Sequence, residues 1–200
     1  DLLYRTAAKF GQRTALVDGE QRISYAALDA RSSRFARYLL DSIGPGKQVG
    51  MLCANSIDMV VAFNGIHKAS QVWVPVNIKL DVAAIGYILQ HAEVSAVVVD
   101  QEMLGLPGLV LVGLLKQLAV PLILTRVAAG SELGMTVDGL TLTQAEAGQS
   151  DQLPEVEIDD NQAALLMYTS GTTGNPKGVV HSHLSVYSAI QGNIDEIHYR

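Results

Sequence analysis

The stretch that decides the fold is QVGMLCANSIDMVVAFNGIHKASQVWVPV, residues 48–76, in which two apolar runs flank a segment with helical character. The runs QVGMLCA and VWVPV are apolar at almost every position, whereas a strand with one exposed face alternates apolar and polar residues. Continuous apolar strands joined by a helix are typical of a parallel sheet that helices cover on both faces. The stretch therefore predicts the α/β class.

The same alternation of helices and strands continues toward the C-terminus. The most hydrophobic stretch, residues 108–124, is short for a membrane span and contains Lys116 and Gln117 near its centre, so it predicts a buried helix and a strand. We therefore expect no integral membrane segment. The expected elements after residue 76 are a helix over 81–92, a strand over 95–99, a helix near 109–118 and a strand over 121–125.

The N-terminal part predicts a short helix over 2–10 and a hairpin of TALVDG and QRISY, with Asp18 and Gly19 in the turn. Ser24 is a candidate N-cap for a helix that extends to about Leu40. For the organisation of the chain we expect three parts. These are a hairpin plus an α/β unit (1–127), a connecting segment (128–160) and a unit that contains a glycine-rich loop (161–200).

Composition excludes several classes of function. The formal net charge of −6 and the absence of basic clusters interleaved with aromatic residues argue against nucleic acid as a partner. Cys53 is the sole cysteine, so neither an intrachain disulfide nor a multi-cysteine metal site is possible. The N-terminus lacks the features of a secretory signal, and we expect a cytoplasmic protein.

The chemistry of the chain is concentrated in AALLMYTSGTTGNPKGVVHSHLSVY, residues 163–187, which predicts a strand, a loop, a second strand and a helix. Glycines at 171, 174 and 178 allow consecutive backbone N–H groups to converge on an anion. Lys177 adds a positive charge, and a cation about 4 Å from a phosphate charge contributes roughly 4 kcal/mol at an effective dielectric near 20, before desolvation. The hydroxyl donors of the loop are Thr169, Ser170, Thr172 and Thr173.

Other interpretations of this segment fit less well, although a flexible turn with a solvated lysine is a possible alternative. A Walker A loop would have glycine in place of Pro176, a hydroxyl residue in place of Gly178 and a helix afterwards. A serine hydrolase would show a G-x-S-x-G elbow, which does not surround Ser170. His181 and His183 would lie on one side of a strand, but no third ligand follows, and we expect no metal site.

Four further side chains are expected to be structural. His67 and His91 lie on predicted helices, where buried histidines with satisfied hydrogen bonds or surface histidines are the default. Trp73 and Tyr168 flank strand cores and are interpreted as packing residues.

The pattern YTSGTTGNPKGV, residues 168–179, closely resembles the signature loop of the adenylate-forming superfamily. That superfamily comprises acyl- and aryl-CoA synthetases, adenylation domains of peptide synthetases and beetle luciferases. The upstream chain also resembles the N-terminal subdomain of these enzymes, and the TSGTTG spelling is more similar to the CoA ligases. The sequence departs from the usual pattern outside the loop at Ser70, Gln71, Ile78, Leu184 and Ser185.

The resemblance implies the N-terminal part of an AMP-forming acyl-CoA synthetase, with the C-terminal remainder absent and little activity for this part alone. The implied reaction converts ATP and a carboxylic acid, fatty or aryl, to acyl-AMP and pyrophosphate and then transfers the acyl group to CoA. Mg²⁺ is an implied cofactor, with its ligand expected further along the chain. The implied ATP-binding residues are Thr169, Ser170, Gly171, Thr172, Thr173, Gly174 and Lys177, of which Lys177 also has an ancillary catalytic role in stabilising phosphate charge. The alternatives are a peptide-synthetase-type adenylation domain and a non-catalytic nucleotide-binding module.

Overall fold

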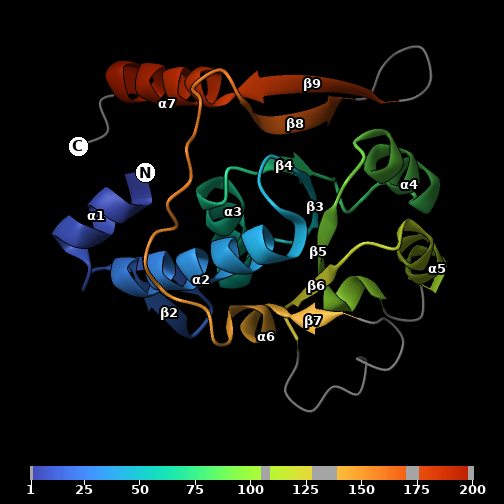
Figure 1. Ribbon diagram of the computed structural model, residues 1–200, viewed down its shortest axis with the longest axis horizontal. Coiled ribbons are helices and arrows are strands. Elements are labelled where there is room, and N and C mark those ends of the chain that lie inside the picture. Colours follow the sequence, from blue (N-terminus) through green and yellow to red (C-terminus); the bar gives the residue numbers. More distant parts are fainter. Residues whose placement is uncertain (1, 105–108, 128–138, 170–175, 198–200) are drawn as a thin grey trace.

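The computed structural model describes residues 2–104, 109–127, 139–169 and 176–197 (Figure 1). The helices are α1 (Leu2–Phe10), α2 (Tyr25–Ile43), α3 (Ile57–Lys68), α4 (Val82–His91), the 3₁₀ helix η1 (Gln101–Leu104), α5 (Leu109–Leu118), α6 (Leu142–Glu146) and α7 (His183–Ile197). The strands are β1 (Thr14–Asp18), β2 (Gln21–Ser24), β3 (Gln48–Leu52), β4 (Val72–Pro75), β5 (Ala96–Asp100), β6 (Leu122–Thr125), β7 (Leu140–Thr141), β8 (Ala163–Thr169) and β9 (Lys177–Ser182).

Seven strands form one sheet in the order β7-β6-β5-β3-β4-β8-β9. All neighbours in it are parallel except β8 and β9, which are antiparallel. The chain passes from β3 outward to β4, then returns to place β5 on the other side of β3 and continues to β6. The predicted α/β class with a largely parallel sheet is confirmed.

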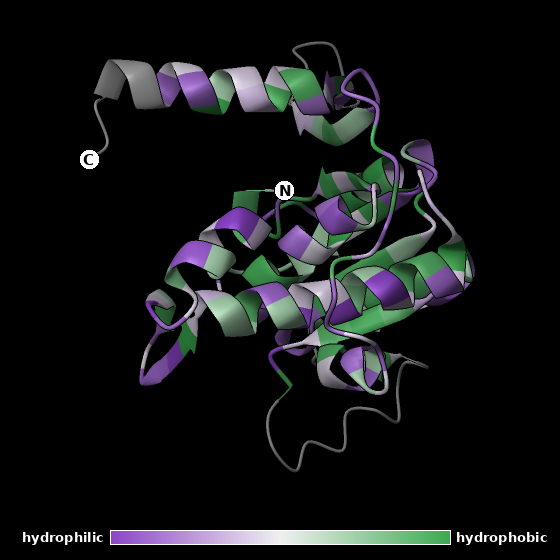
Figure 2. Cartoon of the chain, turned by 60° about the vertical axis from the view of Figure 1, so that its left-hand side comes forward, coloured by the Kyte–Doolittle hydropathy of each residue, from purple (hydrophilic) through white to green (hydrophobic). Residues whose placement is uncertain are grey.

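The sheet separates two hydrophobic cores. Ala96 and Val98 of β5 pack in one core with residues of α2, α3 and α6, while Val97 and Val99 pack in the other with residues of α4 and α5. Figure 1 shows α4 and α5 on one side of the sheet and α2 and α3 on the other. Figure 2 shows the hydrophobic residues concentrated on the strands behind the helices. Burial on both faces explains why the central strands are apolar at consecutive positions.

Helices α2 and α3 approach each other closely because Gly65 has no side chain. A β-carbon at position 65 would lie 2.6 Å from Cδ1 of Phe35 and 3.0 Å from the carbonyl oxygen of Ser32. Such contacts would force the two helices apart. Helix α2 begins where predicted, since Ser24 accepts a hydrogen bond from the Ala27 amide at 3.2 Å, and it extends to Ile43.

Residues 139–160 contain two elements that the sequence analysis did not assign. Strand β7 extends the sheet beside β6, and α6 begins with a capping box between Thr141 and Gln144. Arg31 of α2 binds Glu146 through Nε at 3.0 Å and Nη2 at 2.7 Å, and Asp58 at 3.0 Å. This part of the connection is therefore attached to the sheet edge and to α2. The T-x-x-Q spacing was the signal that could have revealed α6.

The predicted helix and strand in the most hydrophobic stretch correspond to α5 and β6. Within the described ranges, no helix combines the length and apolarity that crossing a membrane requires.

Candidate functional site

The candidate site is the hairpin of β8 and β9, which supports the two ends of the glycine-rich loop. Thr169 is the last residue of β8 and Lys177 the first of β9, and the two are paired in the antiparallel register. Paired residues of an antiparallel ladder present their side chains on the same face. Five of the predicted ATP-binding residues lie outside the described residues: Ser170, Gly171, Thr172, Thr173 and Gly174.

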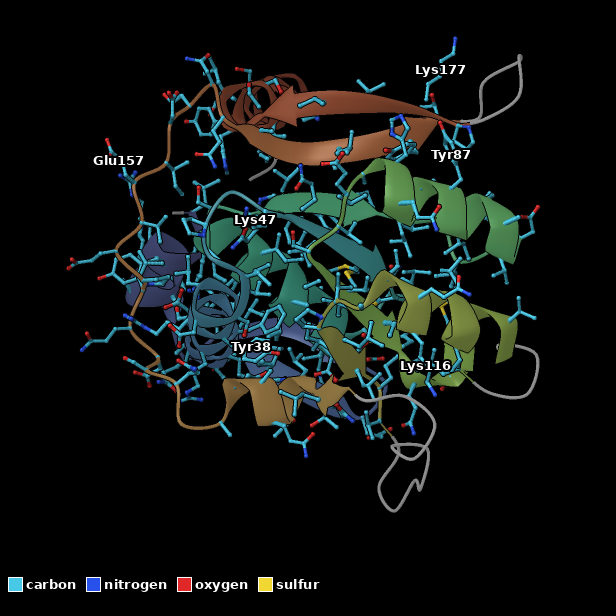
Figure 3. The ribbon with its side chains drawn as sticks, turned by 45° about the vertical axis from the view of Figure 1, so that its right-hand side comes forward. Tyr38, Lys47, Tyr87, Lys116, Glu157 and Lys177 are labelled. Carbon is cyan, nitrogen blue, oxygen red and sulfur yellow. The ribbon has the colours of Figure 1, made fainter. Side chains whose placement is uncertain are left out.

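Lys177 and Thr169 are both exposed at the base of this loop. Among the described residues, no carboxylate forms an ion pair with Lys177. Figure 3 shows the Lys177 side chain projecting away from the sheet beside the loop, whereas Lys47 and Lys116 lie elsewhere on the molecule. A cation and a hydroxyl side by side are thus available to an anion at this position.

The hairpin is joined to the parallel sheet by its strand β8. Trp73 of β4 pairs with Leu165 of β8, and Leu166 and Tyr168 pack against the core that α4 and α5 share. The hydroxyl oxygen of Tyr168 lies 2.7 Å from Nδ1 of His91. Burial, together with Tyr87, raises the pKa of Tyr168. Tyr168 is therefore a packing residue, as predicted, and it also forms a hydrogen bond to α4.

An aromatic cluster lies where α7 meets α3 and β4. The ring of His67 lies 4.6 Å from that of Phe63 and 6.2 Å from that of His183. Burial, followed by the charge of His183, lowers the pKa of His67 to about 4, and burial lowers the pKa of His183. Trp73, which contacts Phe63, and His183 each keep one buried ring nitrogen without a hydrogen-bond partner among the described residues.

The expectation that His181 and His183 share one strand was wrong. His181 lies in β9, but His183 is the first residue of α7, because Ser182 accepts a hydrogen bond from the Ser185 amide at 3.2 Å and begins the helix. In the part of the chain that the structure describes, no three His, Cys, Asp or Glu side chains gather as metal ligands.

The strand after the loop agrees with the argument against a Walker A motif, since a helix would follow the lysine there. The AMP-binding enzyme family model matches residues 3–199. The chain belongs to the AMP-binding enzyme family.

Relatives in this family include two kinds of enzyme. The chain is 30% identical over 190 residues to a medium/long-chain-fatty-acid–CoA/3-oxocholest-4-en-26-oate–CoA ligase of Mycobacterium marinum, covering 92% of this chain and 34% of that protein. It is 32% identical over 186 residues to surfactin synthase subunit 3 of Bacillus subtilis, covering 92% of this chain and 12% of that protein. The chain thus spans about a third of the length of the ligase.

A solved structure of a CoA ligase has the same fold over most of this chain. The anthranilate CoA ligase AuaEII in complex with anthranoyl-AMP superposes with a TM-score of 0.75 at 26% identity, over 92% of this chain and 34% of that chain.

One contact of this family member was missed by sequence reasoning. His91 was expected to be a satisfied or surface histidine, and it is exposed, but its Nδ1 forms the hydrogen bond with Tyr168. The two residues are 77 positions apart in the chain, so no local pattern could have paired them.

Proposed function

We propose that this chain contributes the phosphate-binding loop of an AMP-forming carboxylate–CoA ligase. In the first half-reaction a carboxylate oxygen bonds to the α-phosphorus of ATP, the α–β phosphoanhydride bond breaks, and pyrophosphate leaves. In the second, the thiol of CoA displaces AMP and forms the thioester. The proposal rests chiefly on the loop sequence 168–179 on a hairpin that leaves Thr169 and Lys177 exposed as a pair, in a chain of the AMP-binding family.

The proposed ATP-binding residues of the loop have two roles. Backbone N–H groups and hydroxyls from Thr169 to Gly174 hold the β- and γ-phosphates, because glycines let the backbone approach them closely. Lys177 neutralises the charge that develops on the departing pyrophosphate and so stabilises the transition state. We propose residues 161–200 as the unit that presents this loop and residues 1–127 as the α/β support.

The substrates and cofactors are part of the same proposal. The fatty-acid–CoA ligase relative and the anthranilate CoA ligase structure support a fatty or aryl acid as the carboxylate and CoA as the acceptor. The described residues offer no group of metal ligands, so Mg²⁺ would enter on the ATP phosphates and take its protein ligand from elsewhere. The single cysteine of the chain suits a reducing compartment, which supports a cytoplasmic location as part of the proposal.

A second candidate function is amino-acid activation by a peptide-synthetase-type adenylation domain. The 32% identity to surfactin synthase subunit 3 favours it. The first half-reaction would be the same, but the acid would be an amino acid and the acceptor a carrier-protein thiol rather than CoA. A non-catalytic nucleotide-binding module is the third alternative.

Acid-dependent ATP–pyrophosphate exchange by the full-length protein tests the proposal. The acids are octanoate, palmitate, benzoate and a mixture of amino acids, and the variant is Lys177→Ala. We expect exchange with a fatty or aryl acid and about a 100-fold loss of kcat in Lys177→Ala, the scale of removing one charge-stabilising group. The melting temperature should not change, because Lys177 is exposed. Lys116→Ala, which removes an exposed lysine of α5, is the matched control and should exchange normally.

Three outcomes would contradict the proposal. Exchange with amino acids alone, with no thioester formed on CoA, would favour the peptide-synthetase function. Exchange that Lys177→Ala leaves intact would remove the loop lysine from the mechanism. An absence of exchange with every acid, combined with ATP binding by calorimetry, would indicate a non-catalytic module.

A further inference from the structure

The phosphate loop has a stem, which consists of Tyr168 and Thr169 at the end of β8 and Lys177 and Gly178 at the start of β9. A side-chain hydrogen bond connects this stem to α4. Tyr168 precedes Thr169 at the end of β8, and its hydroxyl oxygen lies 2.7 Å from Nδ1 of His91. The two rings meet edge to face, with centroids 5.7 Å apart and an interplanar angle of 88°. Tyr87, one turn earlier on α4, has its ring 5.3 Å from that of His91. Figure 3 shows Tyr87 at the same end of the hairpin as Lys177.

Tyr168 restrains both strands of the stem. Its register partner on β9 is Gly178, the residue after Lys177. A β-carbon at position 178 would lie 3.2 Å from Cζ of Tyr168 and 3.0 Å from Cδ1 of Leu166. The tyrosine ring therefore lies against the backbone of Gly178, in the space that a side chain would otherwise fill. A displacement of this ring would be transmitted to both ends of the loop.

The anchor on α4 is rigid because this helix is packed into the core. Ile88 and Leu89, which precede His91 by one turn or less, are 2% and 0% exposed. His91 is the last residue of α4, and the next residue, Ala92, is also buried. The backbone of His91 therefore has little freedom to follow movements of the hairpin, although its side chain is exposed.

Tyr168 and the phosphate-binding side chains lie on opposite faces of the hairpin. Successive residues of a strand alternate in direction, so Thr169 and its partner Lys177 face away from the side on which Tyr168 meets α4. Restraint of one face leaves the other open to ligand. The hydrogen bond can thus fix the position of Lys177 without touching ATP.

We propose that Tyr168 and His91 are positioning residues that hold the stem of the phosphate loop in the geometry needed for ATP. This inference rests on the proposed function. Pre-positioned donors cost no reorganisation during the reaction, so their loss raises the barrier of the step in which they act. The hydrogen bond should therefore affect acyl-AMP formation and have no effect on thioester formation from acyl-AMP, in which no pyrophosphate is held.

The experiment is a double-mutant cycle in the full-length protein with Tyr168→Phe, His91→Phe and both together. Each change keeps a ring and removes one partner of the hydrogen bond. Two rates are measured: kcat/KM for ATP in ATP–pyrophosphate exchange, and the single-turnover rate of thioester formation from synthetic acyl-AMP and CoA. Tyr38→Phe, which removes the hydroxyl of a half-buried tyrosine on α2, is the matched control (Figure 3). His91→Asn, whose amide can occupy the position of Nδ1, is the rescue variant.

We expect each phenylalanine variant to lower kcat/KM for ATP by about two- to tenfold, the range of one net hydrogen bond. The double variant should have a kcat/KM for ATP no lower than that of the more impaired single variant, because both changes remove the same interaction. Thioester formation should be unchanged, and His91→Asn should be closer to wild type than His91→Phe.

Equal losses in both half-reactions would overturn the inference, because they would show a general structural role. Additive losses in the cycle, or wild-type exchange in all variants, would also overturn it while leaving the proposed function intact. If the wild-type protein shows no exchange with any acid, the proposed function fails and this inference fails with it.

Discussion

Acidification below pH 6.5 should destabilise the fold through His67. This residue lies on α3, with its ring 4.6 Å from Phe63, 6.3 Å from Trp73 and 6.2 Å from His183. Burial among these rings, followed by the charge of His183, lowers the pKa of His67 to about 4. Protonation would place a charge in an apolar environment that offers it no carboxylate among these contacts.

The size of the effect follows from the difference between the two pKa values. The unfolded chain has the ordinary histidine pKa of 6.5 and the folded chain about 4, a difference of about 2.5 units. Each unit corresponds to about 1.36 kcal/mol, so protonation of His67 alone should lower the free energy of unfolding by roughly 3 kcal/mol. The unfolded state binds more protons in this interval. The stability is therefore fully present above pH 6.5 and is lost as the pH falls toward 4.

The assay is urea unfolding followed by circular dichroism at pH 7.5, 6.5, 5.5 and 4.5, for the wild-type chain and for His67→Gln. Glutamine does not titrate, so the variant lacks this contribution while all carboxylates titrate in both proteins. The free energy of unfolding of the wild type should fall more steeply than that of the variant, and the difference between the two proteins should change by roughly 3 kcal/mol between pH 7.5 and the lowest pH. The lowered pKa of His183 acts in the same direction in both proteins.

Parallel curves for the two proteins would refute this reasoning. They would mean that His67 is solvated or gains an acidic partner in solution, so that the charged ring is tolerated. A steeper fall of the free energy of unfolding in His67→Gln than in the wild type would mean that the fold raises the pKa of His67 instead of lowering it.

Two further predictions concern the buried ammonium of Lys68 and the partly buried thiol of Cys53. The Lys68 ammonium is fully buried and binds the Asp29 carboxylate at 2.5 Å and Ser33 Oγ at 2.9 Å, so Asp29→Ala should lower the free energy of unfolding by about 3–5 kcal/mol in urea titrations. Adding Lys68→Met to that variant should recover much of the loss, and a cost below about 1 kcal/mol for Asp29→Ala would contradict the prediction. Burial raises the pKa of Cys53 to about 12, so the native chain at pH 8 should react with iodoacetamide far more slowly than the chain in 8 M urea. Equal labelling rates by mass spectrometry would show that this thiol is accessible and ionised.

Local patterns in the sequence predicted most of the elements that support the site. The runs QVGMLCA and SAVVV correspond to β3 and β5. The hairpin of β1 and β2 was also predicted correctly, but its turn consists of Gly19 and Glu20, because Asp18 is the last residue of β1 and pairs with Gln21. Ser24 caps α2 as expected. These predictions succeeded because the apolar period of a helix or strand and the hydrogen bond of a cap depend on residues within a few positions of each other.

Features that depend on distant contacts could not be read in the same way. Strand β7 has only two residues and lies at the sheet edge, so it has too little periodicity to be recognised. His183 was assigned to the strand that contains Val179 and Val180, but β9 ends at Ser182, whose hydroxyl accepts a hydrogen bond from the Ser185 amide at the start of α7.

The sequence by itself determined the α/β class and the composition of the loop, which contains a cation as well as hydroxyl groups. Only the tertiary structure decided that β5 lies beside β3, that Thr169 and Lys177 form the paired stem, and that His91 reaches Tyr168 across 77 residues. The physical reason is that local periodicity specifies which face of an element is buried, whereas its partner is selected by the packing of the whole chain.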